Sequence, residues 1–213
     1  MRRLKLFVGI MVMGWLALPV TCAATGEPQR APLLLQHPTL SRARIAFDFA
    51  GEIWTVAREG GEARLLVAGQ GRCTGPIYSP DGSRIAFTAT YDGNTDVYVV
   101  PSGGGEPKRL TYHPDADEAL GWTPDGKHVL FRSMRASFRD LTQLYTVPAD
   151  GGVPTLLPLP SGFEASYGRD VQHLAYTPFS QWQPAWKKYR GGQTVRVWLA
   201  DLSRSSVEPV PRD

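Results

Sequence analysis

The stretch SPDGSRIAFTATYDGNTDVYVVPSGGGEPKRLT, residues 79–111, decides the expected fold. It opens with Pro80-Asp81-Gly82, a turn in which proline presets φ, aspartate caps the local backbone and glycine accepts a positive φ. Short apolar strands follow at 85–87 and 97–100, and the glycines at 103–105 form a hairpin turn before a last strand that ends in Leu-Thr. With the strand that precedes the first turn, this order predicts four short antiparallel strands.

The same order of motifs occurs in three other places. One copy, from Thr123, reads TPDGKHVLF and continues to QLYTVPADGGVPTLL; another reads GRDVQHLAYTPF from Gly168 and resumes as VRVWLADL; a truncated one reads RIAFDFAGEIWTVAREGGEARLL from Arg44. The apolar triplets begin at Ile45, Ile85, Val129 and Leu174, spacings of 40, 44 and 45 residues. Four-stranded units at this period are typical of β-propeller blades.

We therefore predict an all-β fold, a β-propeller with four-stranded blades. Residues 25–213 are expected to form a partial propeller with blades at about 38–68, 73–112, 117–158 and 163–210. A blade is stabilised by stacking on its neighbours. Two series of aromatic residues recur at equivalent places and are expected to form this inter-blade core rather than to stack on a ligand. They are Phe47, Phe87, Phe131 and Tyr176, followed in the next strand by Trp54, Tyr98, Tyr145 and Trp198.

The repeat also resembles a known family. The Pro-Asp-Gly turn, the Ile-Ala-Phe strand, the Asp-x-Tyr strand and the Gly-Gly…Leu-Thr ending are similar to the WD40-like repeats of TolB-type and tricorn-type six-bladed propellers. Two stretches, LTYHPDADEALGWTPDGKHVLFRS at 110–133 and WQPAWKKYRGGQTVRVWLADL at 182–202, resemble the first propeller of tricorn protease and its bacterial homologues. The resemblance extends from about Pro32 to the C-terminus and implies about four of six blades.

The resemblance implies a function for the propeller. Tricorn-type enzymes combine a six-bladed propeller, a seven-bladed propeller, a PDZ domain and a serine peptidase domain, and the first propeller is thought to admit peptides. By this resemblance the chain is a non-catalytic propeller that guides peptides toward a peptidase domain it does not contain. The alternative is a TolB-like periplasmic scaffold that binds other proteins, although TolB proteins usually carry an α/β domain before the propeller.

The N-terminal residues predict export. Residues 1–24 comprise MRRLK, an apolar run from Leu6 to Val20, and small residues up to Ala24, which is the layout of a signal peptide. The run is too short to favour a permanent membrane span. Cleavage after Ala23 or Ala24 is expected, with lipidation at Cys22 as the alternative. We expect a periplasmic or secreted protein in which Cys73 is a lone thiol that acts as an inert small hydrophobic residue.

Charge and motifs exclude several function classes. Three of the 23 basic residues lie in the first five positions, so the remaining chain has 20 basic and 20 acidic side chains. Because a nucleic-acid binder needs a concentrated cationic face, we expect no nucleic-acid partner. The sequence has no Gly-x-Ser-x-Gly elbow, no His-Glu-x-x-His motif and no cysteine pair for zinc, so we assign no catalytic residue, cofactor or metal.

Two segments are candidates for peptide contact. The linker residues His113, Asp115 and Asp117, beside Glu118, form a polar group that either contacts a peptide or cation or serves as a hydrogen-bonding loop. The insertion at 178–194 interleaves aromatic and cationic side chains, which bind peptides or pack over the blade. Its candidate residues are Trp182, Trp186, Lys187, Lys188, Tyr189 and Arg190.

Two further expectations concern the fourth copy and the assembly. Val171 occupies the place of the turn glycine, so a different or strained turn is expected there. An open arc of blades leaves sheet faces and strand edges uncovered, which predicts self-association, with peptides or other protein chains as further partners.

Overall fold

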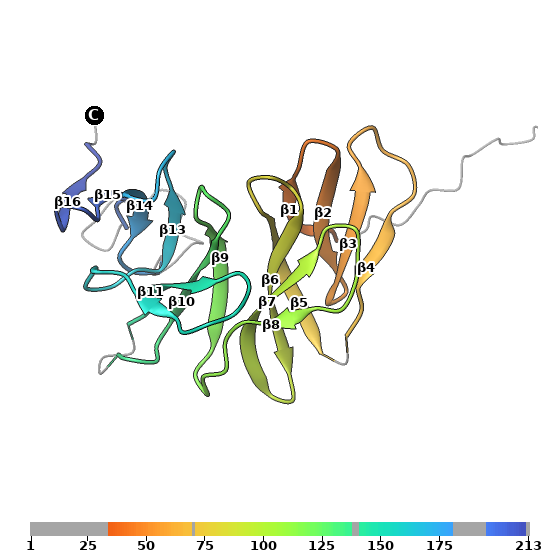
Figure 1. The fold of residues 1–213 in the computed structure, drawn as a ribbon, viewed down its shortest axis with the longest axis horizontal. Coiled ribbons are helices and arrows are strands. Elements are labelled where there is room, and N and C mark those ends of the chain that lie inside the picture. The colour runs from red at the N-terminus through yellow and green to blue at the C-terminus, as the bar shows by residue number, and fades with distance from the viewer. Residues whose placement is uncertain (1–33, 70, 138–140, 181–194, 212–213) are drawn as a thin grey trace, which may run out of the picture. The chain divides into compact units, whose positions relative to one another are not determined.

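The computed structural model describes residues 34–69, 71–137, 141–180 and 195–211. Within these ranges the chain contains sixteen strands and no helix, and hence no helix that could cross a membrane. The strands form four antiparallel four-stranded sheets, each with its strands hydrogen-bonded in chain order. This confirms the predicted all-β fold with four-stranded blades (Figure 1).

The first two sheets contain the truncated copy and the copy that begins at Ser79. Sheet 1 consists of β1 (Gln36–Leu40), β2 (Arg44–Phe49), β3 (Glu52–Ala57) and β4 (Arg64–Val67). Sheet 2 consists of β5 (Arg72–Tyr78), β6 (Arg84–Tyr91), β7 (Asn94–Pro101) and β8 (Lys108–Arg109). The Pro-Asp-Gly turn therefore joins the first two strands of sheet 2.

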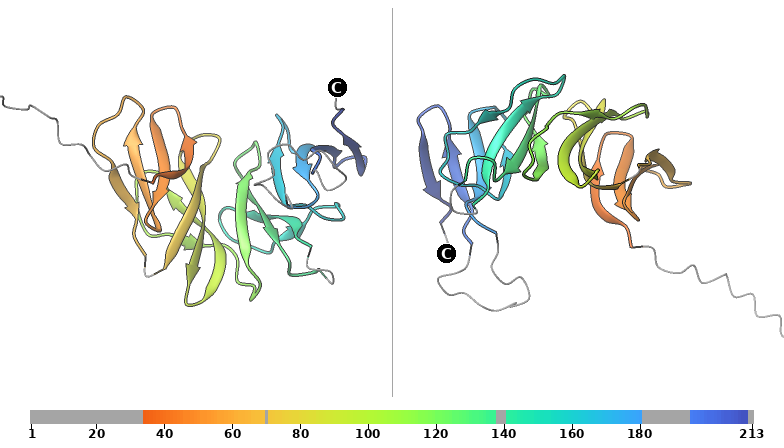
Figure 2. Two further views of the ribbon diagram at one scale, coloured as in Figure 1. Left: turned by 180° about the vertical axis from the view of Figure 1, so that it is seen from behind. Right: turned by 90° about the horizontal axis from the view of Figure 1, so that it is seen from below.

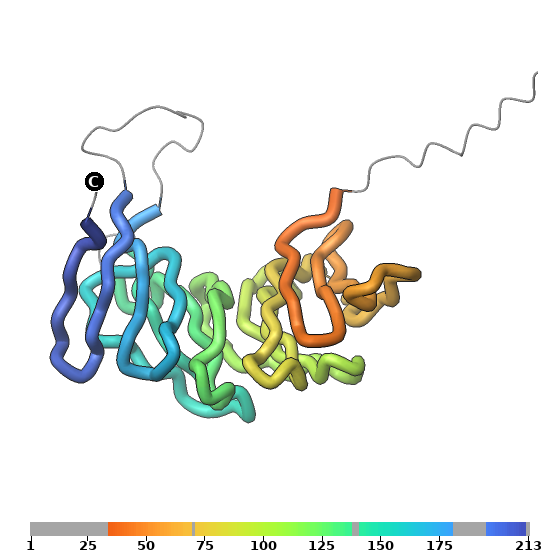
Figure 3. Tube along the Cα trace, turned by 90° about the horizontal axis from the view of Figure 1, so that it is seen from above, coloured from red at the N-terminus to blue at the C-terminus, as the bar shows by residue number. Residues whose placement is uncertain are grey.

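The last two sheets repeat this plan. Sheet 3 consists of β9 (Asp117–Trp122), β10 (His128–Ser133), β11 (Gln143–Pro148) and β12 (Thr155–Leu156). Sheet 4 consists of β13 (Glu164–Tyr167), β14 (His173–Thr177), β15 (Trp198–Asp201) and β16 (Ser206–Pro209). The chain passes through the four sheets in order, and each contacts the next (Figures 2 and 3).

Alternation along the second strand of each sheet explains how the sheets stack. Successive side chains of a strand point to opposite faces. In sheet 2, Ile85 and Phe87 pack against sheet 1, whereas Ala86 packs against sheet 3 with Val129 and Phe131. The first aromatic series is buried in all four sheets. Phe87, Phe131 and Tyr176 lie in the clusters between neighbouring sheets, which confirms them as inter-blade core, whereas Phe47 is in none of these clusters. In the second series, Tyr98 and Tyr145 are buried and the two tryptophans of the outer sheets are half-buried.

The turn in sheets 2 and 3 has the predicted chemistry. Gly82 and Gly126 have φ of +75° and +69°, the left-handed region that glycine enters without strain. The carboxylate of Asp81 accepts hydrogen bonds from the Ser79 hydroxyl (2.6 Å) and the Ser83 N–H (3.0 Å). These bonds lower the pKa of Asp81 to about 2. Asp125 makes the equivalent bonds in sheet 3.

The fourth copy has a different turn without backbone strain. Val171 is not among the residues with positive φ. Asp170 nevertheless accepts the N–H groups of Gln172 (2.8 Å) and His173 (2.9 Å), so the aspartate keeps its capping role. The sequence predicted either a different turn or a strained one at Val171, and the structure has a different turn in which Val171 has no positive φ.

Candidate functional site

The first strands of all four sheets line one cleft of about 580 Å³. β1 contributes His37, β5 contributes Arg72, β9 contributes Glu118 and β13 contributes Glu164. Each of these residues lies in the first two positions of its strand. The cleft runs along these first strands, which are the inner strands of the four sheets, and it is assembled from residues that are about 40 positions apart in the chain.

Hydroxyl groups form the part of the cleft between sheets 2 and 3. Thr74 lies on β5, Thr88 and Thr90 on β6, and Thr95 on β7, and all four line the cleft. The Thr90 and Thr95 hydroxyls are 2.8 Å apart and hydrogen-bond to each other. Thr74 makes no side-chain hydrogen bond within the described residues and is half-exposed. This surface offers hydrogen-bond donors and acceptors without a net charge.

A recurring polar residue links each sheet to the next. It is the residue after the buried aromatic in the second strand: Asp48, Thr88 and Arg132 in sheets 1 to 3. Asp48 accepts the N–H of Gly75 on β5 (3.2 Å), and Thr88 accepts the N–H of Ala119 on β9 (3.0 Å). β5 and β9 both have bulges near these groups, which disturb the ladder and leave an N–H for the neighbouring sheet.

Arg132 fills the same role in sheet 3 with a charge. Its Nη1 donates to the carbonyl of Phe163 (2.9 Å) and to Glu164 Oε1 (2.7 Å), and its Nη2 donates to Glu118 Oε2. The guanidinium also lies 3.8 Å from the centre of the Phe163 ring, a cation–π contact. Arg132 therefore holds one glutamate on each side of the boundary between sheets 3 and 4.

At the opposite side of the cleft, His37 is paired with Asp48. The His37 Nδ1 and Asp48 Oδ1 atoms are 2.7 Å apart, and Asp48 is buried. Arg72, the first residue of β5, is exposed and forms no ion pair within the described residues. The free guanidinium of Arg72 on β5 and the two glutamates held by Arg132, on β9 and β13, thus lie on different strands of one cleft.

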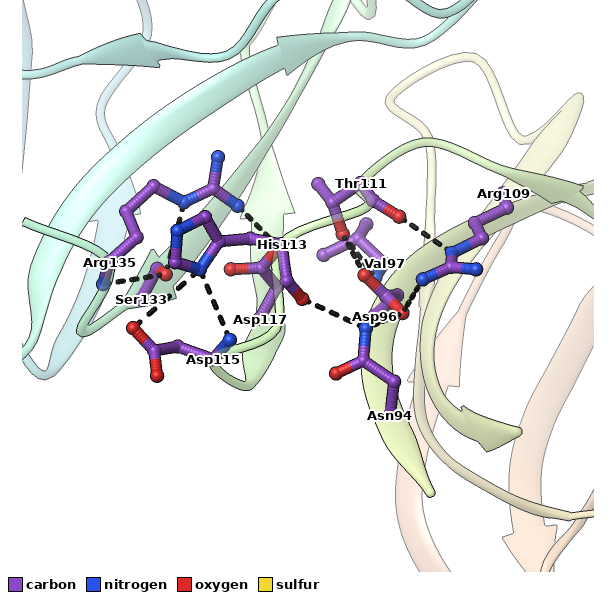
Figure 4. A network of polar contacts seen from close by, with 10 residues as sticks. All are labelled: Asn94, Asp96, Val97, Arg109, Thr111, His113, Asp115, Asp117, Ser133 and Arg135. Carbon is purple, nitrogen blue, oxygen red and sulfur yellow. Dashed lines mark hydrogen bonds and ion pairs between the residues drawn. The ribbon is translucent and has the colours of Figure 1, made fainter. Parts of the chain in front are cut away.

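A buried polar network lies beside the cleft, where sheets 2 and 3 meet (Figure 4). Asp96 Oδ1 accepts the hydroxyl of Thr111 (3.1 Å), and its Oδ2 accepts Arg109 Nη2 (2.5 Å) and Asn94 Nδ2 (2.9 Å). Burial raises the pKa of Asp96, although Arg109 and Thr111 oppose the shift. The charge of nearby Asp117 raises it further.

The predicted linker residues lie in this network. Asp117 is fully buried, its Oδ2 accepts a hydrogen bond from Arg135 Nη2, and its Oδ1 has no hydrogen-bond partner. His113 Nδ1 accepts the N–H of Asp115 (3.1 Å), and the carbonyl of His113 accepts Asn94 Nδ2 (2.8 Å). Asp115 is exposed. These contacts match the hydrogen-bonding role that the sequence left open, and peptide contact at these three residues stays a prediction.

The second predicted group falls on residues outside those that the structure describes. Trp182, Trp186, Lys187, Lys188, Tyr189 and Arg190 all lie between 181 and 194. Their role in recognition, like the signal peptide at 1–24 and Cys22, stays a prediction. Cys73 is described, and it is free and buried. Burial raises the pKa of its thiol, in keeping with the inert role predicted for it.

Sequence reasoning missed the charged residues of the cleft. Glu118 was recognised as part of the polar linker group but not as a residue of the cleft, and neither Arg132 nor Glu164 was singled out. One signal was available: aligning the repeats puts a polar residue after each buried aromatic, in a strand that is otherwise apolar. A polar residue that recurs inside a buried strand needs a hydrogen-bond partner, which predicts a contact with the next sheet.

The cleft provides charges and hydrogen-bonding groups for binding. Among the described residues, no three side chains of histidine, cysteine, aspartate or glutamate are grouped to hold a metal ion. Four-stranded meanders stacked in chain order around inner strands that share a cleft define the class of the protein: it is a β-propeller domain.

The chain belongs to a particular family within that class. The model of the tricorn protease N-terminal β-propeller domain matches residues 32–213, so the chain is a member of that family. Tricorn protease homolog 1 of Streptomyces coelicolor is 31% identical over 170 residues, which cover 79% of this chain and 16% of the relative. A Sulfurisphaera tokodaii protein, named as a tricorn-like protease N-terminal subunit, is 26% identical over 73% of this chain and 80% of that protein.

Solved structures share the fold. The crystal structure of the tricorn protease superposes with a TM-score of 0.72 at 24% identity, covering 86% of this chain and 19% of that one. TolB from Acinetobacter baumannii superposes with a TM-score of 0.64 at 22% identity, covering 83% and 43%. This chain therefore spans only about one sixth of the length of its Streptomyces relative.

Proposed function

We propose that this chain is a non-catalytic propeller domain that binds peptides in the cleft between its inner strands and guides them toward a peptidase domain. The observation that supports the proposal is the cleft itself, because one open surface gathers hydroxyls and charges from four successive sheets. Such a surface suits an extended main chain, whose N–H and C=O groups need partners along their whole length.

The membership of the chain in the tricorn propeller family also supports a role in peptide binding. The peptidase activity of the relatives belongs to proteins much longer than this chain, so the proposed role is limited to binding. A module of this kind needs affinity that is weak enough to release the peptide. We expect dissociation constants of roughly 10 μM to 1 mM, or about 4 to 7 kcal/mol of binding free energy.

The experiment is direct binding of fluorescent, unstructured peptides to the exported chain, measured by anisotropy. Thr74→Trp fills the cleft from β5, and it is expected to abolish binding. Thr155→Trp is the matched control, because Thr155 is exposed on β12 and does not line the cleft. Equal affinity of the wild type and Thr74→Trp would contradict the cleft as the binding site.

We also propose that the chain is exported, on the basis of the pattern of residues 1–24. Expression of the full chain, followed by mass spectrometry of the protein outside the cytoplasm, is expected to find an N-terminus at Ala24 or Thr25. A lipid-modified Cys22 would support the lipoprotein alternative instead. A chain that keeps Met1 and stays in the cytoplasm would overturn the proposal.

A further inference from the structure

The cleft is lined by two arginines, Arg72 and Arg132, and two glutamates, Glu118 and Glu164, and these charged groups are unequally shielded from solvent. Arg132 is only 14% exposed, whereas its partners Glu118 and Glu164 are 44% and 61% exposed. The guanidinium is therefore covered by its two carboxylates and by Phe163, and the carboxylates face the solvent of the cleft. A ligand meets the two glutamates before it meets the arginine.

The two carboxylates have unused capacity to accept hydrogen bonds. Each bonds Arg132 through one oxygen, Glu118 through Oε2 and Glu164 through Oε1. Within the described residues neither glutamate accepts any other hydrogen bond. Two negative charges share one positive charge, so this side of the cleft has an excess charge of −1, and each glutamate has one carboxylate oxygen without a hydrogen bond among the described residues.

Because Arg132 bonds both glutamates, their side chains are more ordered than those of ordinary surface glutamates. A flexible surface glutamate loses side-chain entropy when it binds a cation, which is one reason why exposed ion pairs contribute little. Here the forked guanidinium has already ordered both side chains. The side-chain entropy of the two glutamates is therefore lost when the sheets pack, so a cationic ligand group does not have to order them on binding.

We propose that the Glu118–Glu164 pair makes the cleft selective for peptides that carry a cationic group, a lysine or arginine side chain. This rests on the proposed function, because it assigns a substrate class to the same cleft. The positive charge of the peptide would take the free oxygens, and the peptide main chain would lie along the threonine hydroxyls of sheet 2. A peptide with a glutamate at the same position would be repelled by the excess charge.

Arg72 allows a test of whether binding depends on the sign of the charge in the cleft. It is exposed in the same cleft without an ion-pair partner among the described residues, so it repels a cationic peptide. Removing its charge should strengthen the binding of such a peptide, whereas removing the charge of either glutamate should weaken it. Damage to the fold would weaken binding in every case, so opposite changes separate electrostatics from damage.

The test uses three capped peptides that differ at one central residue: lysine, acetyl-lysine or glutamate. Capping removes the terminal charges, and acetyl-lysine has nearly the same shape as lysine without its charge. At low salt we expect the wild type to bind the lysine peptide about tenfold more tightly than the acetyl-lysine peptide, and the glutamate peptide most weakly. This preference should shrink as the ionic strength rises.

The variants Glu118→Gln and Glu164→Gln each keep an oxygen for Arg132 and are expected to reduce the preference to about threefold. Arg72→Gln should increase it, and Glu62→Gln, a charge loss at an exposed site away from the cleft, should leave it unchanged. Urea unfolding of each variant checks the fold.

Equal binding of the lysine and acetyl-lysine peptides to the wild type would overturn charge selection and leave the proposed function standing. An equal effect of Glu62→Gln and Glu118→Gln would also overturn it, because the selectivity would then reflect net charge. Binding of none of the three peptides would overturn both proposals.

Discussion

Arg135 donates a hydrogen bond from Nη2 to the carboxylate of Asp117, a residue with no exposed surface at the boundary between sheets 2 and 3. The guanidinium also lies 5.1 Å from the ring centres of Phe131 and Tyr145. Arg135, in the loop between β10 and β11, thus neutralises the carboxylate of Asp117 at the start of β9. It also packs against the two aromatic rings of sheet 3.

Removal of Arg135 is therefore expected to be costly. Arg135→Ala leaves the charge of Asp117 buried without its partner, which typically costs about 3 to 5 kcal/mol of unfolding free energy. Urea unfolding followed by tryptophan fluorescence measures the loss. Asp115→Ala is the control, because Asp115 is exposed in the same linker, and it should change stability by no more than about 0.5 kcal/mol. Equal losses in the two variants would contradict a structural ion pair at Asp117.

The link between Thr88 and the next sheet gives a second prediction. Thr88→Val keeps the shape of the side chain but removes the acceptor for the Ala119 N–H, and it is expected to cost about 1 to 2 kcal/mol. Thr74→Val, the same substitution at a cleft residue whose side chain makes no hydrogen bond within the described residues, should be nearly neutral. Hydrogen exchange at Ala119 reports the same contact, and unchanged protection in Thr88→Val would exclude it.

The turn aspartates predict how stability depends on pH in acid. The pKa of Asp81 is about 2 in the folded chain, below its ordinary 3.8, and the pKa values of Asp125, Asp170 and Asp201 are lowered as well. Their contribution to stability is fully present above about pH 4 and is lost as the pH falls toward 2. Asp96, whose pKa is raised, changes stability in the opposite direction.

We therefore expect Asp81→Asn to flatten the fall in stability between about pH 4 and pH 2, because one of the groups with a lowered pKa no longer titrates. Thermal unfolding at half-unit pH steps provides the measurement. Glu62→Gln, a charge loss at an exposed position, should keep the wild-type slope. An Asp81→Asn profile parallel to that of the wild type would refute the assignment.

The two kinds of turn predict that glycine and valine cannot be exchanged in either direction without a loss of stability. Gly126→Val puts a β-branched residue at φ +69°, and it is expected to cost about 2 kcal/mol or more. The strain is conformational, since an added Cβ would meet Pro80 only at an ordinary 3.7 Å. Val171→Gly should not stabilise the fourth turn and should cost about 0.5 to 1 kcal/mol, because glycine adds freedom to the unfolded chain. A stabilised Val171→Gly variant would point to a strained turn.

The outer face of sheet 4 predicts self-association of the chain. Leu199 on β15 is exposed on this face, and β16, the last strand, pairs with β15 on one side and with no other strand among the described residues. We expect light scattering to detect dimers or larger species, and Leu199→Lys to increase the fraction of monomer. Val153→Lys, at an exposed apolar residue in the β11–β12 turn, is the control. A wild type that is monomeric at all concentrations would contradict this prediction.

Much of the fold could be predicted because its determinants are local. The spacing of Ile45, Ile85, Val129 and Leu174 follows the sheets, and Phe87 and Phe131 are the buried residues that the repeat indicated. The turn at Val171 was less predictable. A missing glycine excludes one turn type but does not say which of the others the chain adopts, since the hydrogen bonds of Asp170 compensate for the change.

The candidate site was predictable only in its parts. Asp117 was recognised as part of a polar linker group, yet its partner Arg135 lies 18 positions further along, and no local pattern relates the two. Glu118 and Glu164 are 46 positions apart and meet only because sheets 3 and 4 pack with Arg132 between them. Such a pairing depends on the stacking of blades, which the sequence of either blade alone does not contain.

The sequence by itself determined the repeat, the four-stranded blade, the buried aromatic series and the membership in a propeller family, because strand alternation and turn chemistry act over a few residues. Only the tertiary structure decided that the first residues of four inner strands share one cleft. It also decided that one arginine serves two glutamates there, and that Asp117 is buried while Arg72 is free. Charges acquire these roles from neighbours that are remote in the chain, and burial changes the energy of a charge far more than its position in the sequence does.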